Sequence, residues 1–222
     1  MAAEKHLLFD TPPDFRDQVL SFGVQRVDAL FITHPHADHF SAARYLKDKT
    51  GAPTAIGEKV TEVQKLWKDF YNWPDFPADG SQWDRLFAHG ETFKVGSIDA
   101  KVMFSPGHTL ASITYVIGDA AFVHDTLFMP DSGTARADFP GGSASRLYKS
   151  IMEILSLPDE TRIFTGHNYR PGGREPLWES TVAEQRATNT HMSKCATEAE
   201  FVAVRQARDK TLAMPKLILH AL

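Results

Sequence analysis

The sequence has a single cysteine, Cys195, among its 222 residues, so no disulfide can form within the chain. It also lacks any apolar run close to the roughly 20 residues that a membrane-spanning helix needs. Residues 1–6 lack the apolar segment of a signal peptide. These absences favour a protein of a reducing compartment that does not enter a membrane, and we expect a cytoplasmic location.

An excess of positive charge is missing as well. Lysine and arginine total 24 against 28 aspartates and glutamates, which gives a net charge of -4. Proteins that bind nucleic acid usually present a basic face, so we expect no nucleic-acid partner. The hydrophobic fraction of 42% and the charged fraction of 23% are ordinary for a globular protein. The length suits one domain with a modest extension.

What the sequence does contain is an alternation of short apolar runs and helical segments. Strands are expected at residues 7–9, 28–33, 53–56, 92–95, 98–104, 112–117, 120–123 and 162–164. Helices are expected at residues 14–22, 40–49, 58–70 and 143–155 and over much of 177–213, and residues 71–90 are expected to form a long loop. This order predicts α/β layers.

Metal-capable side chains follow the ends of several of these strands. The segment His34-Pro-His36-Ala-Asp38-His39 holds four of them within six residues. On a strand His34 and His36 would share one face. Imidazole and carboxylate groups suit both zinc and iron. The alternative, a histidine-rich surface loop, is disfavoured by the spacing.

Three further candidates lie at comparable places along the chain. His108 stands between two expected strands, Asp125 follows the strand at 120–123, and His167 follows the strand at 162–164. Each alone could be a turn residue, a helix cap or a buried structural histidine. Together they stand where α/β sheets place their sites, which predicts one joint metal centre.

The ordered set HxHxDH, Gly-His, Asp and Gly-His resembles the metallo-β-lactamase superfamily. That resemblance implies an αββα sandwich with a metal site at one edge of two sheets. The implied ligand positions are His34, His36, Asp38, His39, His108, Asp125 and His167. We expect this domain to span residues 1–176, with a helical C-terminal extension, residues 177–222, packed on it. The chain starts late relative to this fold, which leaves open the loss of its first strand or strands, and a homodimer could cover the exposed edge.

Longer stretches resemble the persulfide dioxygenase branch, relatives of glyoxalase II. They are residues 39–46, 79–84, 125–131, 133–142, 166–174 and 211–215. The resemblance implies one Fe(II) per chain and oxidation of glutathione persulfide by O2 to sulfite and glutathione. It implies that the iron ligands are His34, His108 and Asp125.

The same resemblance assigns roles to residues beside the iron. Asp38, His39 and His167 would hold water and orient the ligands, and Asp38 and Arg136 would serve catalysis. Arg136 would face a carboxylate of the glutathione substrate, and a salt bridge within its own loop is the alternative.

The chain departs from that branch at several positions. His124 stands where the branch has Gly, Ser132 where it has Tyr, Ala137 where it has Cys, and Asn168 where it has Asp. The first 30 or so residues, above all residues 7–16, look more like the phosphodiesterase branch.

Two other functions therefore stay open. One is a hydrolase with one or two Zn(II) ions, acting on a glutathione thioester, lactone, β-lactam or phosphodiester. The other is a metal-binding module without catalysis.

Overall fold

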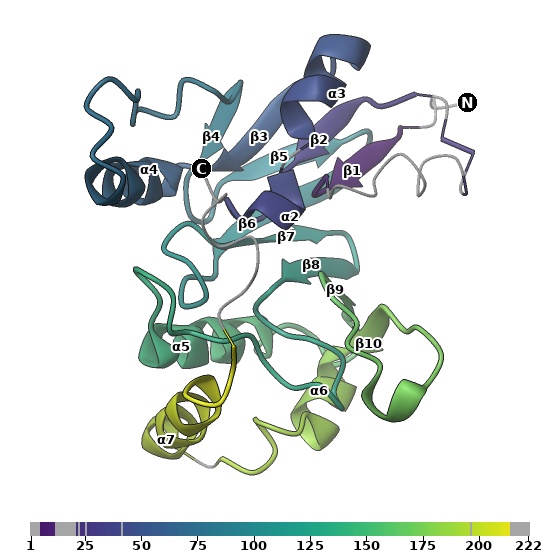
Figure 1. Cartoon of the computed structure of the whole chain (residues 1–222). Coiled ribbons are helices and arrows are strands. Elements are labelled where there is room, and N and C mark those ends of the chain that lie inside the picture. The colour runs from purple at the N-terminus through teal and green to yellow at the C-terminus, as the bar shows by residue number, and fades with distance from the viewer. Residues whose placement is uncertain are drawn as a thin grey trace.

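The computed structural model describes residues 5–11, 21, 23–24, 26–40, 42–195 and 197–213, apart from the side chains of residues 37 and 38. Two β-sheets lie face to face, and helices cover the outer face of each (Figure 1). The expected αββα sandwich is confirmed. Among the described residues, no helix has the length and apolar character that crossing a membrane requires.

The first sheet contains four parallel strands in the order β1-β2-β3-β4. They are β1 (Leu7–Phe9), β2 (Ala29–Phe31), β3 (Thr54–Gly57) and β4 (Arg85–Phe87). Parallel neighbours need a crossover, and α3 (Ala43–Thr50) and α4 (Val60–Phe70) supply two of them. Ile32 and Ile56 pack against these helices, whereas Phe31 and Ala55 face the other sheet. Strands β2 and β3 are mostly buried on both faces, which explains their continuous apolar runs.

The second sheet has six strands in the order β10-β9-β8-β7-β6-β5. They are β5 (Thr92–Val95), β6 (Ile98–Phe104), β7 (Ile113–Ile117), β8 (Ala120–His124), β9 (Arg162–Thr165) and β10 (Glu179–Thr181). Every pairing is antiparallel except β8 with β9. That one parallel pair is connected through α5 (Ala144–Ile154), whose cap Ser143 accepts from the Arg146 backbone N–H.

Hydrogen bonds join the two sheets directly where β2 ends. The Tyr115 hydroxyl on β7 donates to the Ile32 carbonyl at 3.1 Å, and the Ile113 N–H donates to the Thr33 carbonyl at 3.0 Å. Tyr115 is fully buried in the aromatic core between the sheets. The segment that begins at His34 therefore leaves β2 at a point where the sandwich is tightly held.

The C-terminal helices cover the second sheet together with α5 (Figure 1). They are α6 (Val182–Thr188) and α7 (Glu198–Asp209), and each begins with a capping box, at Thr181 and Thr197. Phe201 of α7 is fully buried in the same core cluster as Leu147 of α5. A short 3₁₀ turn, η1 (Pro171–Gly173), lies in the loop between β9 and β10.

Most expected elements are found, and the exceptions are short. Residues 71–90 contain β4, a three-residue strand that is stabilised by pairing with β3 and carries no long apolar run. The expected helix at 40–49 is two helices, α2 (Ala37–Phe40) and α3. The C-terminal segment from residue 177 begins with β10 before it becomes helical. Of the helix expected at 14–22, the structure describes only residue 21, which is helical, and the other positions lie outside the described residues. The division at residue 176 stays an interpretation.

Candidate metal centre

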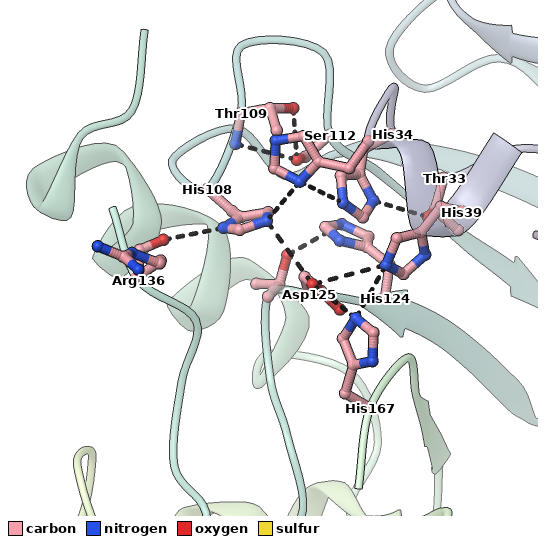
Figure 2. Close-up of polar contacts among 12 residues, drawn as sticks. Thr33, His34, His39, His108, Thr109, Ser112, His124, Asp125, Arg136 and His167 are labelled. Carbon is pink, nitrogen blue, oxygen red and sulfur yellow. Dashed lines mark hydrogen bonds and ion pairs between the residues drawn. The ribbon is translucent and has the colours of Figure 1, made fainter. Parts of the chain in front are cut away.

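Six of the seven expected ligand residues meet at one end of the sandwich. Five lie around a common centre in Figure 2, and His36 joins them through contacts with His34 and His108. Three sets of residues each bring their ligand atoms within 4.8 Å of one another. His34, His36 and His108 form the first group, His39, Asp125 and His167 form the second, and Asp10, His34 and His39 form a further set that overlaps both. Asp38, the seventh, belongs to α2, but its side chain lies outside the described part of the chain.

The first group has the spacing of atoms around one ion. Nδ1 of His36 lies 3.1 Å from Nε2 of His34 and 3.1 Å from Nε2 of His108. Nitrogens placed tetrahedrally around a zinc ion at 2.0–2.1 Å would be about 3.3 Å apart. Two neutral imidazoles that present unprotonated nitrogens cannot hydrogen-bond to each other. A cation between them fits the spacing.

Hydrogen bonds behind His34 decide which of its nitrogens faces the centre. Asp10, at the end of β1, accepts from the Thr33 backbone N–H at 2.8 Å and from the Thr33 hydroxyl. Having donated its proton, that hydroxyl accepts from Nδ1 of His34 at 3.1 Å. Nε2 of a neutral His34 then carries the lone pair, which is the form that coordinates a metal.

The same argument applies to two more histidines. Nδ1 of His39 donates to Oδ2 of Asp10 at 2.7 Å, and Nδ1 of His108 donates to the Arg136 carbonyl at 2.9 Å. Both partners only accept, so Nδ1 must carry the proton in each ring. Nε2 of each ring is left toward the centre. Such support is typical of metal-binding histidines.

Asp125 belongs to the second group and also lies close to His108 of the first. Its Oδ2 lies 3.2 Å from Nε2 of His167 and 3.6 Å from Nε2 of both His39 and His108. Its Oδ1 is buried and has no hydrogen-bond partner among the described residues. A buried carboxylate oxygen without a donor is costly, and a bound cation would satisfy it. The residues therefore fit a metal ion.

The protonation states point the same way. Burial lowers the pKa of His34 well below its usual value, with a further contribution from His39, and burial also lowers the pKa of His108. Burial raises the pKa of Asp125, but His167 and His39 outweigh it and hold that pKa well below the usual range. Neutral imidazole and ionised carboxylate are the ligand forms that bind metal.

His39 has the opposite shift. Burial lowers its pKa, but the carboxylates of Asp10 and Asp125 outweigh burial and raise the pKa well above its ordinary value. The space between these two carboxylates thus favours a positive charge. A metal cation supplies that charge as a proton does.

The glycine of each Gly-His pair is required by close packing. A Cβ on Gly107, whose φ is +141°, would lie 2.3 Å from the backbone nitrogen of Leu147 in α5. A Cβ on Gly166 would lie 2.7 Å from Oδ1 of Asp125. The first glycine lets the His108 loop rest on α5, and the second lets the His167 loop approach the carboxylate.

Arg136 makes a salt bridge within its own loop. Its guanidinium donates to both oxygens of Asp138, at 2.7 and 2.8 Å, and to the Ala213 carbonyl at 2.7 Å, and it lies over the Phe139 ring. The alternative given for this side chain is therefore present in the structure. A contact with substrate stays a prediction.

The sequence argument missed Asp10 and Thr33. Asp10 was interpreted only as the end of the first strand. The signal that could have identified it is the one used for Asp125, a carboxylate directly after a short apolar strand. Its φ of +61°, unusual outside glycine, also marks a position held by specific contacts.

His124 lies beside the metal ligands. Its φ is +43°, which suits the glycine of the related branch better than histidine. The buried ring lies 5.1 Å from that of His34, and its Nε2 contacts the hydroxyls of Ser105 at 3.1 Å and Thr126 at 3.0 Å. It thus forms the wall of the centre behind His34.

The other departures lie in the surrounding loops. Ala137 is buried, Ser132 donates to Asp131, and Asn168 accepts from the Arg174 guanidinium.

Comparisons with known proteins agree with this geometry. A family model described as the metallo-beta-lactamase superfamily matches residues 3–167. A "Beta-lactamase hydrolase-like protein" of Xylella fastidiosa (strain 9a5c) is 70% identical over 196 residues, which cover 88% of this chain and 45% of that protein. The chain thus spans less than half the length of that relative. "Glyoxylase B2" of Dictyostelium discoideum is 47% identical over 193 residues, 86% of this chain and 66% of that protein.

Among solved structures, ETHE1 from Myxococcus xanthus is similar over nearly the whole chain. The TM-score is 0.76 at 28% identity, and the match covers 97% of this chain and 84% of that one. The likeness therefore includes the loops that carry the candidate ligands and the C-terminal helices.

Proposed function

This chain belongs to the metallo-beta-lactamase superfamily, and from that premise we propose that it is an Fe(II)-dependent sulfur dioxygenase. Its substrate is glutathione persulfide, which reacts with O2 and water to give glutathione, sulfite and protons. The C-terminal helices belong to the same functional unit as the sandwich.

The proposal depends on the two-histidine, one-carboxylate set that the family resemblance implies, and the burial of its members supports it. His34, His108 and Asp125 are all buried, as is His39, whereas His36 and His167 are partly exposed. Such a set leaves positions open for O2 and a sulfur ligand. Fe(II), when bound, supplies the O2 chemistry that no amino-acid side chain provides.

The chain's own residues would orient the ligands and keep water away. Asp10 with Thr33 and the Arg136 carbonyl fix the imidazole rings. Phe139 packs edge-on against His36 and His108, with ring centroids 5.2 and 5.3 Å apart, and covers that side of the centre. A persulfide would then approach from the side of His167, whose side chain is 32% exposed.

The rim on that side has groups suited to a peptide thiol. Tyr169 and Trp178 are exposed large aromatics in the loop between β9 and β10, and Arg170 lies exposed beside them. Arg174 is already paired with Asp131. Arg170 donates from Nε to the Arg174 carbonyl at 2.8 Å, and we assign its other N–H groups to a carboxylate of the glutathione moiety, together with Arg136 if it exchanges its bond to Asp138.

A di-zinc hydrolase is the second candidate, and one observation favours it. Oδ2 of Asp125 lies 3.6 Å from Nε2 of His108 in the first group and 3.2 Å from Nε2 of His167 in its own group, as a bridging carboxylate would. Two zinc ions could share that oxygen and activate a water between them. The relative named as a hydrolase-like protein is consistent with this alternative.

The experiment that separates them uses the purified 222-residue chain loaded with Fe(II) or with Zn(II). O2 uptake and sulfite release are measured with glutathione persulfide, and thiol release is measured with a glutathione thioester. The proposal predicts iron-dependent O2 uptake and slow thioester cleavage with either metal. Fast zinc-dependent thioester cleavage without O2 uptake would replace the dioxygenase by the hydrolase.

A further inference from the structure

The loop between β8 and α5 connects the metal centre to the C-terminal helices. It begins with Asp125, and its Arg136 carbonyl accepts from Nδ1 of His108. This loop contains no long helix or strand of its own. Contacts with other parts of the chain must therefore hold the Arg136 carbonyl in place, and this carbonyl determines which ring nitrogen of His108 carries the proton.

The opposite side of the loop is held by a buried ion pair of α7. Arg205 and Asp209 are 3% and 5% exposed, and their side chains approach to 2.8 Å. Asp209 accepts from the Ala137 N–H at 3.0 Å, and Arg205 donates to the Thr134 carbonyl at 3.0 Å. The two contacts lie on either side of Arg136 in the chain.

A third contact holds the same stretch. Nδ1 of His191, which precedes α7, accepts from the Thr134 N–H at 2.9 Å. Ala213, which follows α7, accepts from the Arg136 guanidinium. Residues 134–137 are therefore held at backbone and side-chain atoms by the C-terminal segment. On the side of the metal ligands, the Ala135 N–H donates to the Thr126 carbonyl at 3.4 Å and Nδ1 of His108 donates to the Arg136 carbonyl at 2.9 Å.

Packing alone does not explain this pair. A buried ion pair adds little stability over apolar residues of the same size, because removing two charges from water is expensive. Apolar side chains at 205 and 209 could fill the space but could bind neither the Thr134 carbonyl nor the Ala137 N–H. What the pair supplies is directional contact with the loop.

We propose that Arg205 and Asp209 are positioning residues for His108: they hold the 134–137 backbone so that the Arg136 carbonyl keeps the Nδ1 proton and His108 turns Nε2 toward the metal. This inference rests on the metal centre proposed above. Groups that contact a metal ligand directly usually affect metal affinity or activity about 10–100-fold, and the pair acts through one such group, the Arg136 carbonyl.

The test compares Asp209→Ala, Asp209→Asn and a control, Arg186→Met. Asn keeps an acceptor for the Ala137 N–H, so it should restore part of what Ala loses. Arg186 of α6 similarly donates to the backbone, at the Leu155 carbonyl, and pairs with Asp159, but does not contact residues 134–137. All variants are measured at a temperature where circular dichroism shows them folded.

Two readouts are needed. Metal affinity is measured by competition with a chelator, and the His108 Nδ1 proton is followed by ¹⁵N-edited NMR of the metal-free chain. We expect Asp209→Ala to weaken binding about 10–100-fold and to lose the slowly exchanging Nδ1 proton, with Asn intermediate and Arg186→Met unchanged.

Unchanged metal affinity and a retained Nδ1 proton in Asp209→Ala would overturn the inference, as would equal losses in Arg186→Met. If the wild-type chain binds no metal, the proposed function fails, and the NMR signal alone still decides whether the pair positions His108. A variant too unstable to measure is replaced by the Arg205→Met/Asp209→Leu double variant, which removes both buried charges together. It should lose the Nδ1 proton although it stays folded.

Discussion

The two sheets support their metal ligands in different ways. On the side of the first sheet, Asp10 supports two ligands. It accepts from the Thr33 hydroxyl, which contacts His34, and from Nδ1 of His39, which lies 29 residues away in sequence. On the side of the second sheet, His108 depends on the Arg136 carbonyl, whose loop is held by α7 through a contact between residues 72 apart. The first half of the site is supported by its own sheet, whereas the second half needs the C-terminal helices.

Asp125 lies where the two halves meet, so its loss should have the largest effect. We expect Asp125→Ala to abolish activity and metal binding, because it removes the sole anionic ligand of the iron set and the charge that balances Fe(II). Asp38→Ala should only reduce activity, by about 10–100-fold, since the family resemblance places Asp38 beside the ligands. Turnover and bound metal are measured for both. If Asp38→Ala halves the content of two bound metals and stops hydrolysis, the dioxygenase proposal is wrong.

Metal removal should loosen both halves together. A bound ion would hold the clustered imidazoles and the buried carboxylate together, so we expect binding to contribute to folding. With metal at about 100 times its dissociation constant the contribution is roughly 2.7 kcal/mol, or a Tm shift of about 5–10 °C. Scanning calorimetry with and without chelator measures it. Asp125→Ala is the control, since its Tm should not respond to chelator, and equal wild-type Tm values would contradict the prediction.

Asp10→Asn tests the first half by itself. Asn tolerates the positive φ of this position, so the change removes charge without adding backbone strain. We expect metal affinity to fall about 10-fold, because His39 loses its charged acceptor.

Asp84→Asn is a matched control for Asp10→Asn in the same sheet. Asp84 accepts from the backbone N–H and the hydroxyl of Thr54, as Asp10 does from Thr33, but it contacts no candidate ligand. It should lower the Tm and leave metal affinity unchanged. Equal losses of affinity in the two variants would show that Asp10 acts only on stability.

The smallest expected effect concerns His191 in the second half. Burial, with Arg205 next, lowers its pKa to about 4, and its Nδ1 must stay unprotonated to accept from Thr134. The unfolded chain takes up this proton near pH 6.5 and the folded chain near pH 4. Stability should therefore be lost as pH falls through this window.

The control variant is His191→Gln, because a glutamine side chain does not take up a proton in this pH range. Urea unfolding of both chains between pH 7 and pH 4 should show a steeper loss for the wild type. Parallel curves would mean that this histidine does not contribute to the pH dependence.

The sequence was sufficient for the parts of the site that follow strand ends. His34, Asp125 and His167 each come just after an apolar run, and β2, β8 and β9 indeed precede them. Such a run carries its own signal because both faces of these strands are buried. The spacing of the histidines then predicted one centre.

Other features depend on contacts that no local pattern contains. β4 is only three residues long and forms by pairing with β3. Arg205 and Asp209 look like an ordinary helical i,i+4 pair, and only the packing of α7 on the loop makes them buried partners of its backbone. Asp10 was overlooked because its partners Thr33 and His39 lie far along the chain.

The most direct test of the dioxygenase proposal is the metal content of the 222-residue chain purified without added metal, measured by elemental analysis together with O2 uptake on glutathione persulfide. We predict one iron per chain, with uptake proportional to the iron bound. Two zinc ions per chain with no O2 uptake would contradict the account.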